Sequence, residues 1–451
     1  MNRTLPLILT AALLLTACAS AVPAQPADAT TSPSAAASSP AQPDAAASSP
    51  SQPAAETSAP PLTPKFPVGH LLTLPQNQNS GPVWNTGDAL YELRDASNMT
   101  PEALVLKTDY AALTQSVYCD IPGCTHDSDA CPAYLASDFC VGVMAVDGTV
   151  YTYPGELTNV APTQIYRIDP AVGKTPVAAV PDALPHHMQL QWCDEYALYG
   201  CPLAASHQPG TLYRWDWQND TVQTIPMLAD EKIIACEGSR FLTIRIEANE
   251  PFPNFGSTEQ EKAILAHAVY VYAWLAPATG AREKICTRPY ADGYFHNYYD
   301  GRIYYTGNFR NADTPGQQAA LLYFDTADGT EKTLLETIPF DTYGIDVCEP
   351  FSPAFAGVPQ RYLRVLNVGD AYADCLLDME TGDVLPAPAV TAEGVRRPAL
   401  LLACTASGQW LTTANPRDSY DPQYSLYALW DPADFLADGQ PAAWVTMYAT
   451  E

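Results

Sequence analysis

Asp300-Gly301-Arg302-Ile303-Tyr304-Tyr305 is the clearest copy of a turn and strand pattern that recurs in this chain. An Asp-Gly pair that leads into a run of apolar residues predicts a tight turn between two β-strands. Farther along the chain, Leu321 to Asp325 predicts a third strand, and Thr330 to Leu335 predicts a fourth. The order of strand, tight turn, strand, variable loop, strand and strand therefore predicts one four-stranded unit.

The same order recurs along the chain. Turns that open a unit are expected at Asp147-Gly148, Asp194-Glu195, Glu237-Gly238 and Ser407-Gly408. Third strands are expected at Gln164 to Ile168, Thr211 to Trp215, Val269 to Trp274, Cys375 to Met379 and Ser425 to Trp430. Weaker units start near Gly87-Asp88 and around Gln360 to Val365. The turns are roughly 44 to 63 residues apart, which is compatible with the roughly 40 to 50 residues of a propeller blade.

This recurrence predicts an all-β chain that forms a β-propeller of seven four-stranded blades, with six or eight also compatible. A single blade cannot bury both of its faces, so neighbouring blades must stack around an axis until the ring closes. Two stacked β-sandwiches are the alternative, but they would not require the same order of turns and strands in every unit. The 42 prolines and 25 glycines, which lie between short apolar segments, favour the same fold class.

The N-terminus has the pattern of an exported lipoprotein. Arg3 precedes an apolar run, and Leu15-Thr16-Ala17-Cys18 at its end resembles the bacterial lipobox. We expect residues 1–17 to be a signal peptide and Cys18 to carry the lipid, on the outer face of the bacterial cytoplasmic membrane. Residues 18–65 are rich in Ala, Ser and Pro and predict a disordered tether before a propeller at 66–451. An ordinary secretory signal that contains a cysteine is the alternative.

The charge of the chain excludes one class of partner. It has 22 basic and 50 acidic residues and a net charge of −28. Binding to phosphate backbones requires clusters of Lys and Arg, so we expect no nucleic-acid partner. An acidic surface is also repelled by anionic lipids, so contact with a membrane is expected only through the lipid anchor.

The stretch from Tyr118 to Tyr134 reads YCDIPGCTHDSDACPAY. This stretch and the repeated units resemble exported lipoproteins of Gram-positive anaerobes that carry a low-density-lipoprotein-receptor-related type of β-propeller, a family of unknown function. The resemblance covers most of the chain and implies a propeller held by a lipid anchor. It implies no reaction and no catalytic residues.

The cysteines allow two kinds of structural link. Cys119, Cys124, His126 and Cys131 offer three thiols and an imidazole, which is a ligand set suited to a structural zinc ion. Disulfides among these three cysteines and Cys140 are the open alternative, because exported proteins usually pair their cysteines. Cys193 and Cys201 flank a predicted strand, where they could close a loop through a disulfide or remain buried thiols. No other cofactor is required.

The sequence contains no catalytic motif, so an enzyme is the less favoured class, and no catalytic residue is assigned. Variable loops on one face of a propeller are typical of ligand recognition. The candidates in these loops are aromatic, amide or basic residues that suit a glycan, a peptide or an envelope protein: Phe252, Phe255, Asn308, Arg310, Arg417 and Tyr420. We therefore expect a binding or scaffold module. The alternative is an extracytoplasmic hydrolase of polysaccharide or peptide with a site on the propeller axis.

Overall fold

The computed structural model divides the chain into two units, Met1–Pro60 and Pro61–Glu451, and only the second contains residues that the structure describes. The described residues are 63–74, 83–95, 102–136, 141–157, 164–202, 207–252, 258–290, 295–307, 320–337, 361–366, 374–386, 389–392, 395–414, 426–437 and 439–448. Cys18 and the tether up to residue 62 lie outside them. Neither helix in the described ranges is long and apolar enough to cross a bilayer.

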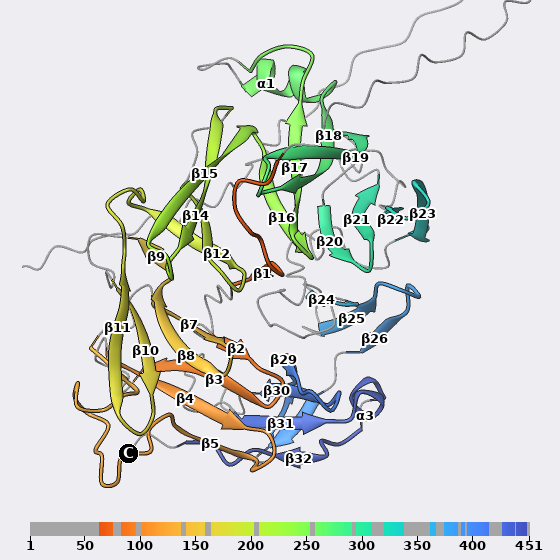
Figure 1. Ribbon diagram of the computed structural model, residues 1–451. Coiled ribbons are helices and arrows are strands. Elements are labelled where there is room, and N and C mark those ends of the chain that lie inside the picture. Colours follow the sequence, from red (N-terminus) through yellow and green to blue (C-terminus); the bar gives the residue numbers. More distant parts are fainter. Residues whose placement is uncertain are drawn as a thin grey trace, which may run out of the picture. The chain divides into compact units, whose positions relative to one another are not determined.

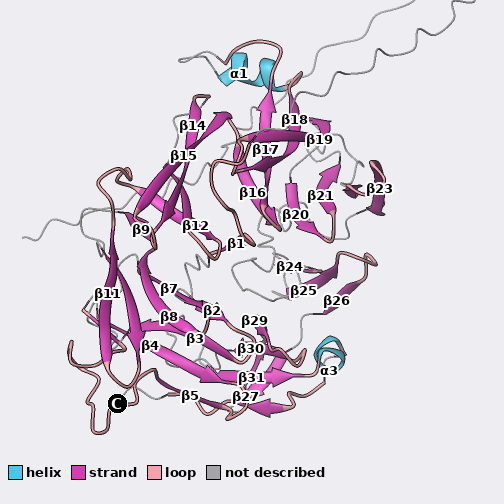
Figure 2. Cartoon of the chain, viewed as in Figure 1, coloured by secondary structure: helices cyan, strands magenta, loops and turns pink. Residues whose placement is uncertain are grey.

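The first three blades are antiparallel sheets whose four main strands follow one another in chain order (Figures 1 and 2). Blade 1 contains β2 (Val83–Asn85), β3 (Ala89–Asp95), β4 (Ala103–Asp109) and β5 (Thr114–Val117), with the short β6 (Tyr134–Leu135) beside β4. Blade 2 contains β7 (Val141–Val146), β8 (Thr149–Pro154), β10 (Gln164–Asp169) and β11 (Gly173–Ala179). Blade 3 contains β12 (Met188–Cys193), β13 (Leu198–Pro202), β14 (Pro209–Asp216) and β15 (Thr221–Ala229), with β1 (Leu72–Thr73) and β9 (Glu156–Leu157) beside β12.

The remaining sheets repeat this plan. Blade 4 contains β16 (Lys232–Glu237), β17 (Arg240–Glu247), β18 (Val269–Ala276) and β19 (Ala281–Pro289), with α1 (Thr258–Leu265) between β17 and β18. Blade 5 contains β20 (Phe295–Tyr299), β21 (Arg302–Gly307), β22 (Ala320–Asp325) and β23 (Thr330–Leu335). A three-stranded sheet follows with β24 (Tyr362–Leu366), β25 (Asp374–Asp378) and β26 (Val384–Pro386), and then a hairpin of β27 (Ala389–Ala392) and β28 (Val395–Pro398). The last blade contains β29 (Leu400–Cys404), β30 (Trp410–Ala414), β31 (Leu426–Trp430) and β32 (Ala443–Trp444), with α3 (Pro432–Leu436) after β31.

The all-β class and the propeller are confirmed. Six sheets among the described residues have four strands or more, so the blade number differs from the favoured seven and matches the six that the sequence also allowed. The weak unit expected around Gln360 to Val365 is the three-stranded sheet, and residues 338–360 before it lie outside the described ranges.

Contacts between aromatic side chains join neighbouring sheets. Ring centroids of Tyr151 in blade 2 and Trp217 in blade 3 are 5.1 Å apart, and those of Trp192 and Phe241, in blades 3 and 4, are 5.5 Å apart. The later junctions have the same character: Trp274 with Tyr298, Tyr362 with Trp410, and the Tyr304 hydroxyl donating to the Met379 carbonyl. Because each sheet buries aromatic area against the next, the blades stabilise one another.

The end of the chain closes the ring on its beginning. Thr446 forms a parallel β-bridge with Thr114 at the start of β5, the outer strand of blade 1. The Gln115 N–H donates to the Thr446 carbonyl at 2.8 Å, and the Thr446 N–H donates to the Leu113 carbonyl at 2.8 Å. The segment after β32 therefore connects the last blade to the first through backbone hydrogen bonds.

The backbone conformation of the turns explains why the repeated units can be recognised in the sequence. Asp300 and Gly301 have φ values of +46° and +72°, and Asp147 and Gly148 have +48° and +73°. Two consecutive positive φ values define the type I′ turn, whose twist matches a β-hairpin and which favours Asp-Gly. The Asp-Gly pairs therefore form the predicted hairpins between β20 and β21 and between β7 and β8.

A second recurring signal lies at the end of the third strand of each unit. In six units the strand is terminated by an aspartate whose carboxylate accepts a backbone N–H two or three residues later: Asp109, Asp169, Asp216, Asp325, Asp378 and Asp431. Such side-chain bonds end the strand and start the next turn. At Asp109 the N–H of Ala112 and the ammonium of Lys107 lower the pKa of the carboxyl group.

The strand order gives each blade two different ends. The turns between the first and second strands and between the third and fourth strands lie at one end, which we call the turn face. The loops between the second and third strands and the connections between blades lie at the other end, which we call the loop face. The turn face and the loop face thus lie at opposite ends of the strands.

Candidate metal centre and loop face

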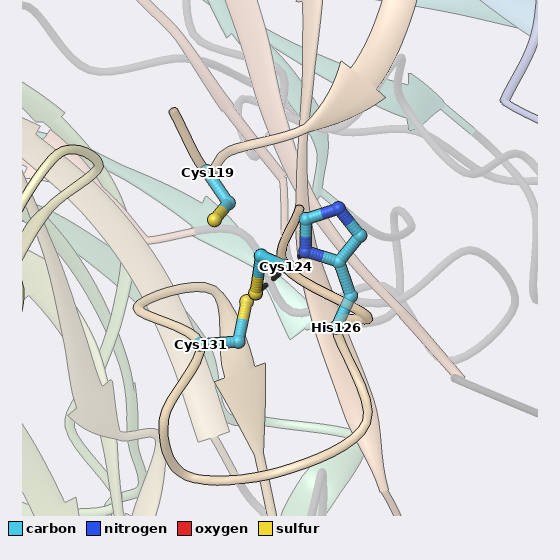
Figure 3. Close-up of side chains that lie close together, drawn as sticks. All are labelled: Cys119, Cys124, His126 and Cys131. Carbon is cyan, nitrogen blue, oxygen red and sulfur yellow. Dashed lines mark hydrogen bonds between the residues drawn. The ribbon is translucent and has the colours of Figure 1, made fainter. Parts of the chain in front are cut away.

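Cys119, Cys124, His126 and Cys131 come together in the segment between β5 and β6 (Figure 3). One potential ligand atom from each residue lies within 4.8 Å of all the others. The His126 Nδ1 is 3.3 Å from the Cys131 Sγ. The three sulfurs belong to free thiols. The four residues that the sequence singled out therefore lie around a common point.

Local backbone geometry creates the cluster. The Cys124 N–H donates to the Ile121 carbonyl at 3.2 Å, which closes a tight turn over Pro122 and Gly123. Gly123 has a φ of +73°, a value that suits glycine at the third position of a type II turn after proline. His126 has a φ of +59°, which is uncommon for a residue with a side chain and turns its imidazole toward the thiols.

Each sulfur in the cluster faces a backbone N–H from the residue two positions later. The donors are Ile121 for Cys119, His126 for Cys124 and Ala133 for Cys131. The N–H of His126 lowers the pKa of Cys124. Burial raises the pKa of Cys119, and it raises the pKa of Cys131 to about 12. The three thiols thus share one arrangement of donors although their burial differs.

The cluster lies at the junction of blades 1 and 2. Cys131 is buried in the core that these blades share, and Cys119 and Cys124 pack against that core. The Asp120 N–H donates to the carbonyl of Pro170 in the turn between β10 and β11 of blade 2, at 2.8 Å. Lys174 of β11 donates to the Asp129 carboxylate at 3.0 Å and to the Tyr134 carbonyl. The loop is therefore attached to both blades.

The suggestion that Cys193 and Cys201 are linked is corrected by the hairpin register. Leu198 lies opposite Cys193 and Cys201 lies opposite Gln189, so the two cysteines are separated along the hairpin between β12 and β13. Four residues of strand span roughly 13 Å, whereas a disulfide needs Cα atoms within about 7 Å. Both thiols are free, and burial raises the pKa of Cys201 to about 12. Cys140 lies outside the described residues.

One of the predicted loop-face residues is described, and it has a specific partner. The Phe252 ring stacks on the His207 imidazole with 3.9 Å between ring centroids and 9° between planes. His207 Nδ1 is 2.9 Å from an Asp230 carboxylate oxygen, and the His207 N–H donates to the other oxygen at 3.0 Å. Phe255, Asn308, Arg310, Arg417 and Tyr420 lie outside the described residues.

This second cluster joins two blades on the loop face. His207 follows β13 of blade 3, Asp230 connects blades 3 and 4, and Phe252 follows β17 of blade 4. Sequence reasoning named Phe252 but missed Asp230. No local pattern could have found it, because the three residues meet only when adjacent blades pack.

The segment before blade 1 lies across the turn face of blades 3 and 4. The Lys65 N–H donates to Ala278 in the turn between β18 and β19, and the Leu71 N–H donates to Gly238 between β16 and β17. The N–H groups of Gly69 and His70 donate to the carboxylates of Asp194 and Glu195, in the turn between β12 and β13. Lys65, which the sequence assigned to the tether, is therefore already part of the folded unit.

The buried Arg214 side chain contacts this segment at Phe66 and Pro67. Its guanidinium lies 4.7 Å from the Phe66 ring and donates to the Pro67 carbonyl at 3.2 Å. It also donates to the Tyr199 hydroxyl at 3.2 Å and to the Gln223 amide oxygen at 2.9 Å. The segment then becomes β1, which pairs with the inner strand β12 of blade 3.

Comparisons with known proteins do not indicate a function for this propeller. No family model matches the chain, and no curated protein matches it. The chain is similar to the β-propeller domain of the Trilobed protease from Pyrococcus furiosus, at 8% identity over 80% of this chain and 96% of that chain, with a TM-score of 0.44. It is also similar to the Pyrococcus horikoshii acylaminoacyl peptidase, at 12% identity over 81% of this chain and 51% of that chain, with a TM-score of 0.40. Saccharomyces cerevisiae Sqt1 has 8% identity over 85% of this chain and 89% of that chain, with a TM-score of 0.37. At these values the similarities give no argument about what this chain binds.

Proposed function

We propose that the chain is an extracytoplasmic lipoprotein, anchored through Cys18, whose propeller presents its loop face to a glycan, a peptide or an envelope protein. The observation that supports this proposal is the course of residues 65–74. The folded unit begins on the turn face, at the bond from Lys65 to Ala278 in blade 4. The first described residues therefore enter the propeller at the end opposite to the loop face.

The pair of Phe252 and His207 is the part of the loop face that we propose for ligand contact. Its stacked rings offer a flat apolar surface beside the Asp230 carboxylate. Ligand sites combine apolar area with a few polar groups that fix orientation. The hydrogen bonds between His207 and the Asp230 carboxylate hold His207 in place, so little ordering of side chains is required on binding.

The charge of the chain supports a module that stands off the membrane. With a net charge of −28, the chain is repelled by anionic lipid headgroups. Contact with the bilayer therefore depends on acyl chains on Cys18, which contribute about 0.8 kcal/mol for each buried methylene group. Two chains of ordinary length are enough for a stable anchor.

The anchor is tested by Cys18→Ser in the full-length chain. We expect the wild-type protein in the membrane fraction of the producing bacterium and the variant in the soluble fraction or medium. Mass spectrometry of the wild type should show a diacylated Cys18 as the first residue. The wild-type protein in the soluble fraction, with an unmodified Cys18, would favour the ordinary secretory signal instead.

Ligand binding is tested by Phe252→Ala and His207→Ala. After a screen of glycans, peptides and envelope proteins, we expect each variant to weaken binding of the ligand at least about tenfold, or about 1.4 kcal/mol, as is typical of an aromatic anchor residue. Val172→Ala is the matched control, because Val172 is 79% exposed and lies in a turn of blade 2 on the turn face. Unchanged binding by both loop-face variants would contradict this site, and cleavage of a bound glycan or peptide would favour the hydrolase alternative.

A further inference from the structure

We propose that Cys119, Cys124, His126 and Cys131 bind one Zn²⁺ ion, and that this ion ties blade 1 to blade 2. The inference concerns the stability of the propeller, so it does not depend on the ligand of the loop face. The segment that carries these residues joins β5 to β6 and contains no other regular structure.

The spacing of the ligand atoms suits a single ion. All four lie within 4.8 Å of one another, and the His126 Nδ1 is 3.3 Å from the Cys131 Sγ. Tetrahedral zinc with bonds of about 2.0 to 2.3 Å separates its ligands by roughly 3.5 to 3.8 Å. Small side-chain movements therefore bring the four atoms to bonding distance without a change in the backbone.

A disulfide accounts for fewer of these features. Disulfides among the three cysteines or with Cys140 would leave the imidazole of His126 without a role. In the structure all three thiols are free, and the His126 Nδ1 lies 3.3 Å from the Cys131 Sγ.

The ligand set identifies the metal and its role. Three thiolates and one imidazole are typical of structural zinc, in which all four positions belong to the protein and none is open to a substrate. Thiolates also disfavour magnesium and calcium, which prefer oxygen ligands. The ion is therefore expected to stabilise the fold and to carry no reaction.

The loop lies where a bound ion would stabilise the junction between blades 1 and 2. Cys131 belongs to the core shared by blades 1 and 2, while Asp120 and Lys174 attach the loop to blade 2. Binding energy at a site that exists only in the folded chain stabilises the folded state. Zinc therefore strengthens the junction between these two blades, where the loop has little apolar side chain of its own to bury.

The test uses the full-length chain in detergent, reduced and then reconstituted with ZnCl₂. Elemental analysis should find about one zinc per chain, as expected for one set of four ligands. Substitution with Co²⁺ should give the visible absorption of tetrahedral cobalt with thiolate ligands. Cys124→Ser and His126→Ala should each lose the bound zinc, while the matched controls Cys286→Ser and His186→Ala should retain it.

Hydrogen exchange distinguishes a stabilising effect of zinc on blades 1 and 2 from an effect on the whole propeller. Removal of zinc by a chelator should increase hydrogen exchange in β5, β6, β10 and β11 and leave β16 to β19 of blade 4 unchanged. Absence of stoichiometric zinc after reduction and reconstitution would overturn the proposal. A disulfide among the three cysteines in the protein isolated without reductant, together with no cobalt spectrum after reduction, would establish the covalent alternative.

Discussion

Glu92→Ala is expected to lower the free energy of unfolding by about 3 to 5 kcal/mol, the cost of removing one partner of a buried ion pair. Glu92 and Arg94 are buried on β3, and the Arg94 guanidinium donates to a Glu92 oxygen at 2.8 Å. Gln115 donates to the same oxygen at 2.9 Å, and the Tyr427 hydroxyl of the last blade donates to the other oxygen at 2.6 Å. Loss of the carboxylate leaves an unpaired charge and two unpaired donors inside the ring closure.

The protonation states support this account. Burial raises the pKa of Tyr427 well above its ordinary value, so the hydroxyl remains a donor to Glu92. Burial lowers the pKa of Arg94, but Glu92 and Tyr427 together outweigh it, so the pKa is raised and the guanidinium remains charged. Glu92→Gln, which keeps the shape but not the charge, should therefore destabilise the chain by a similar amount.

The measurement is the midpoint of urea unfolding for the wild type and each variant. Glu247→Ala is the matched control, because Glu247 also pairs with an arginine two residues away on the same strand, Arg245 at 2.5 Å, but is 53% exposed. Exposed pairs contribute at most about 1 kcal/mol, so the control should remain close to the wild type. Equal effects of the two substitutions would show that the pair at the ring closure has no special weight.

Arg214→Ala is expected to cost about 3 to 5 kcal/mol, because it removes the cation beside the buried Asp216 carboxylate, several buried hydrogen bonds and the packing below residues 65–74. The Arg214 side chain is 0% exposed and lies 3.5 Å from Asp216. The same substitution removes the contacts to Phe66 and Pro67. The segment should therefore detach from blades 3 and 4 before the propeller unfolds.

Limited trypsin digestion should detect the detachment as faster cleavage after Lys65. Arg240→Ala is the matched control: Arg240 also lies over an aromatic ring, with 4.5 Å to Trp274, but its side chain is 41% exposed. The control should cleave at the wild-type rate. If Arg214→Ala left both cleavage and stability unchanged, the segment would be held by its backbone bonds alone.

The fold could be predicted because its signals are local. Asp300-Gly301 forms a hairpin turn through the conformational preferences of two adjacent residues, and Thr330–Leu335 forms the expected fourth strand. The cysteine and histidine cluster was predictable for the same reason, since its members share one loop. Each of these features is determined by residues that lie close together in the sequence.

Features that depend on how sheets pack could not be predicted. Glu92 and Tyr427 are 335 residues apart in the sequence, and His207 and Phe252 come from different blades. The separation of Cys193 and Cys201 follows from the register of a hairpin, which the spacing of two cysteines does not reveal. In these cases the partner of each residue depends on how the sheets pack in the ring and not on the adjacent residues in the sequence.

The bridge between Thr446 and Thr114 has a consequence for biogenesis. Synthesis starts at the amino end, so the edge of β5 is made before the segment around Thr446 that pairs with it. Until that segment is in place, the backbone groups at this edge and the Glu92 carboxylate lack their partners from the last blade. A chain that stopped before β32 would therefore leave blade 1 unpaired at this edge.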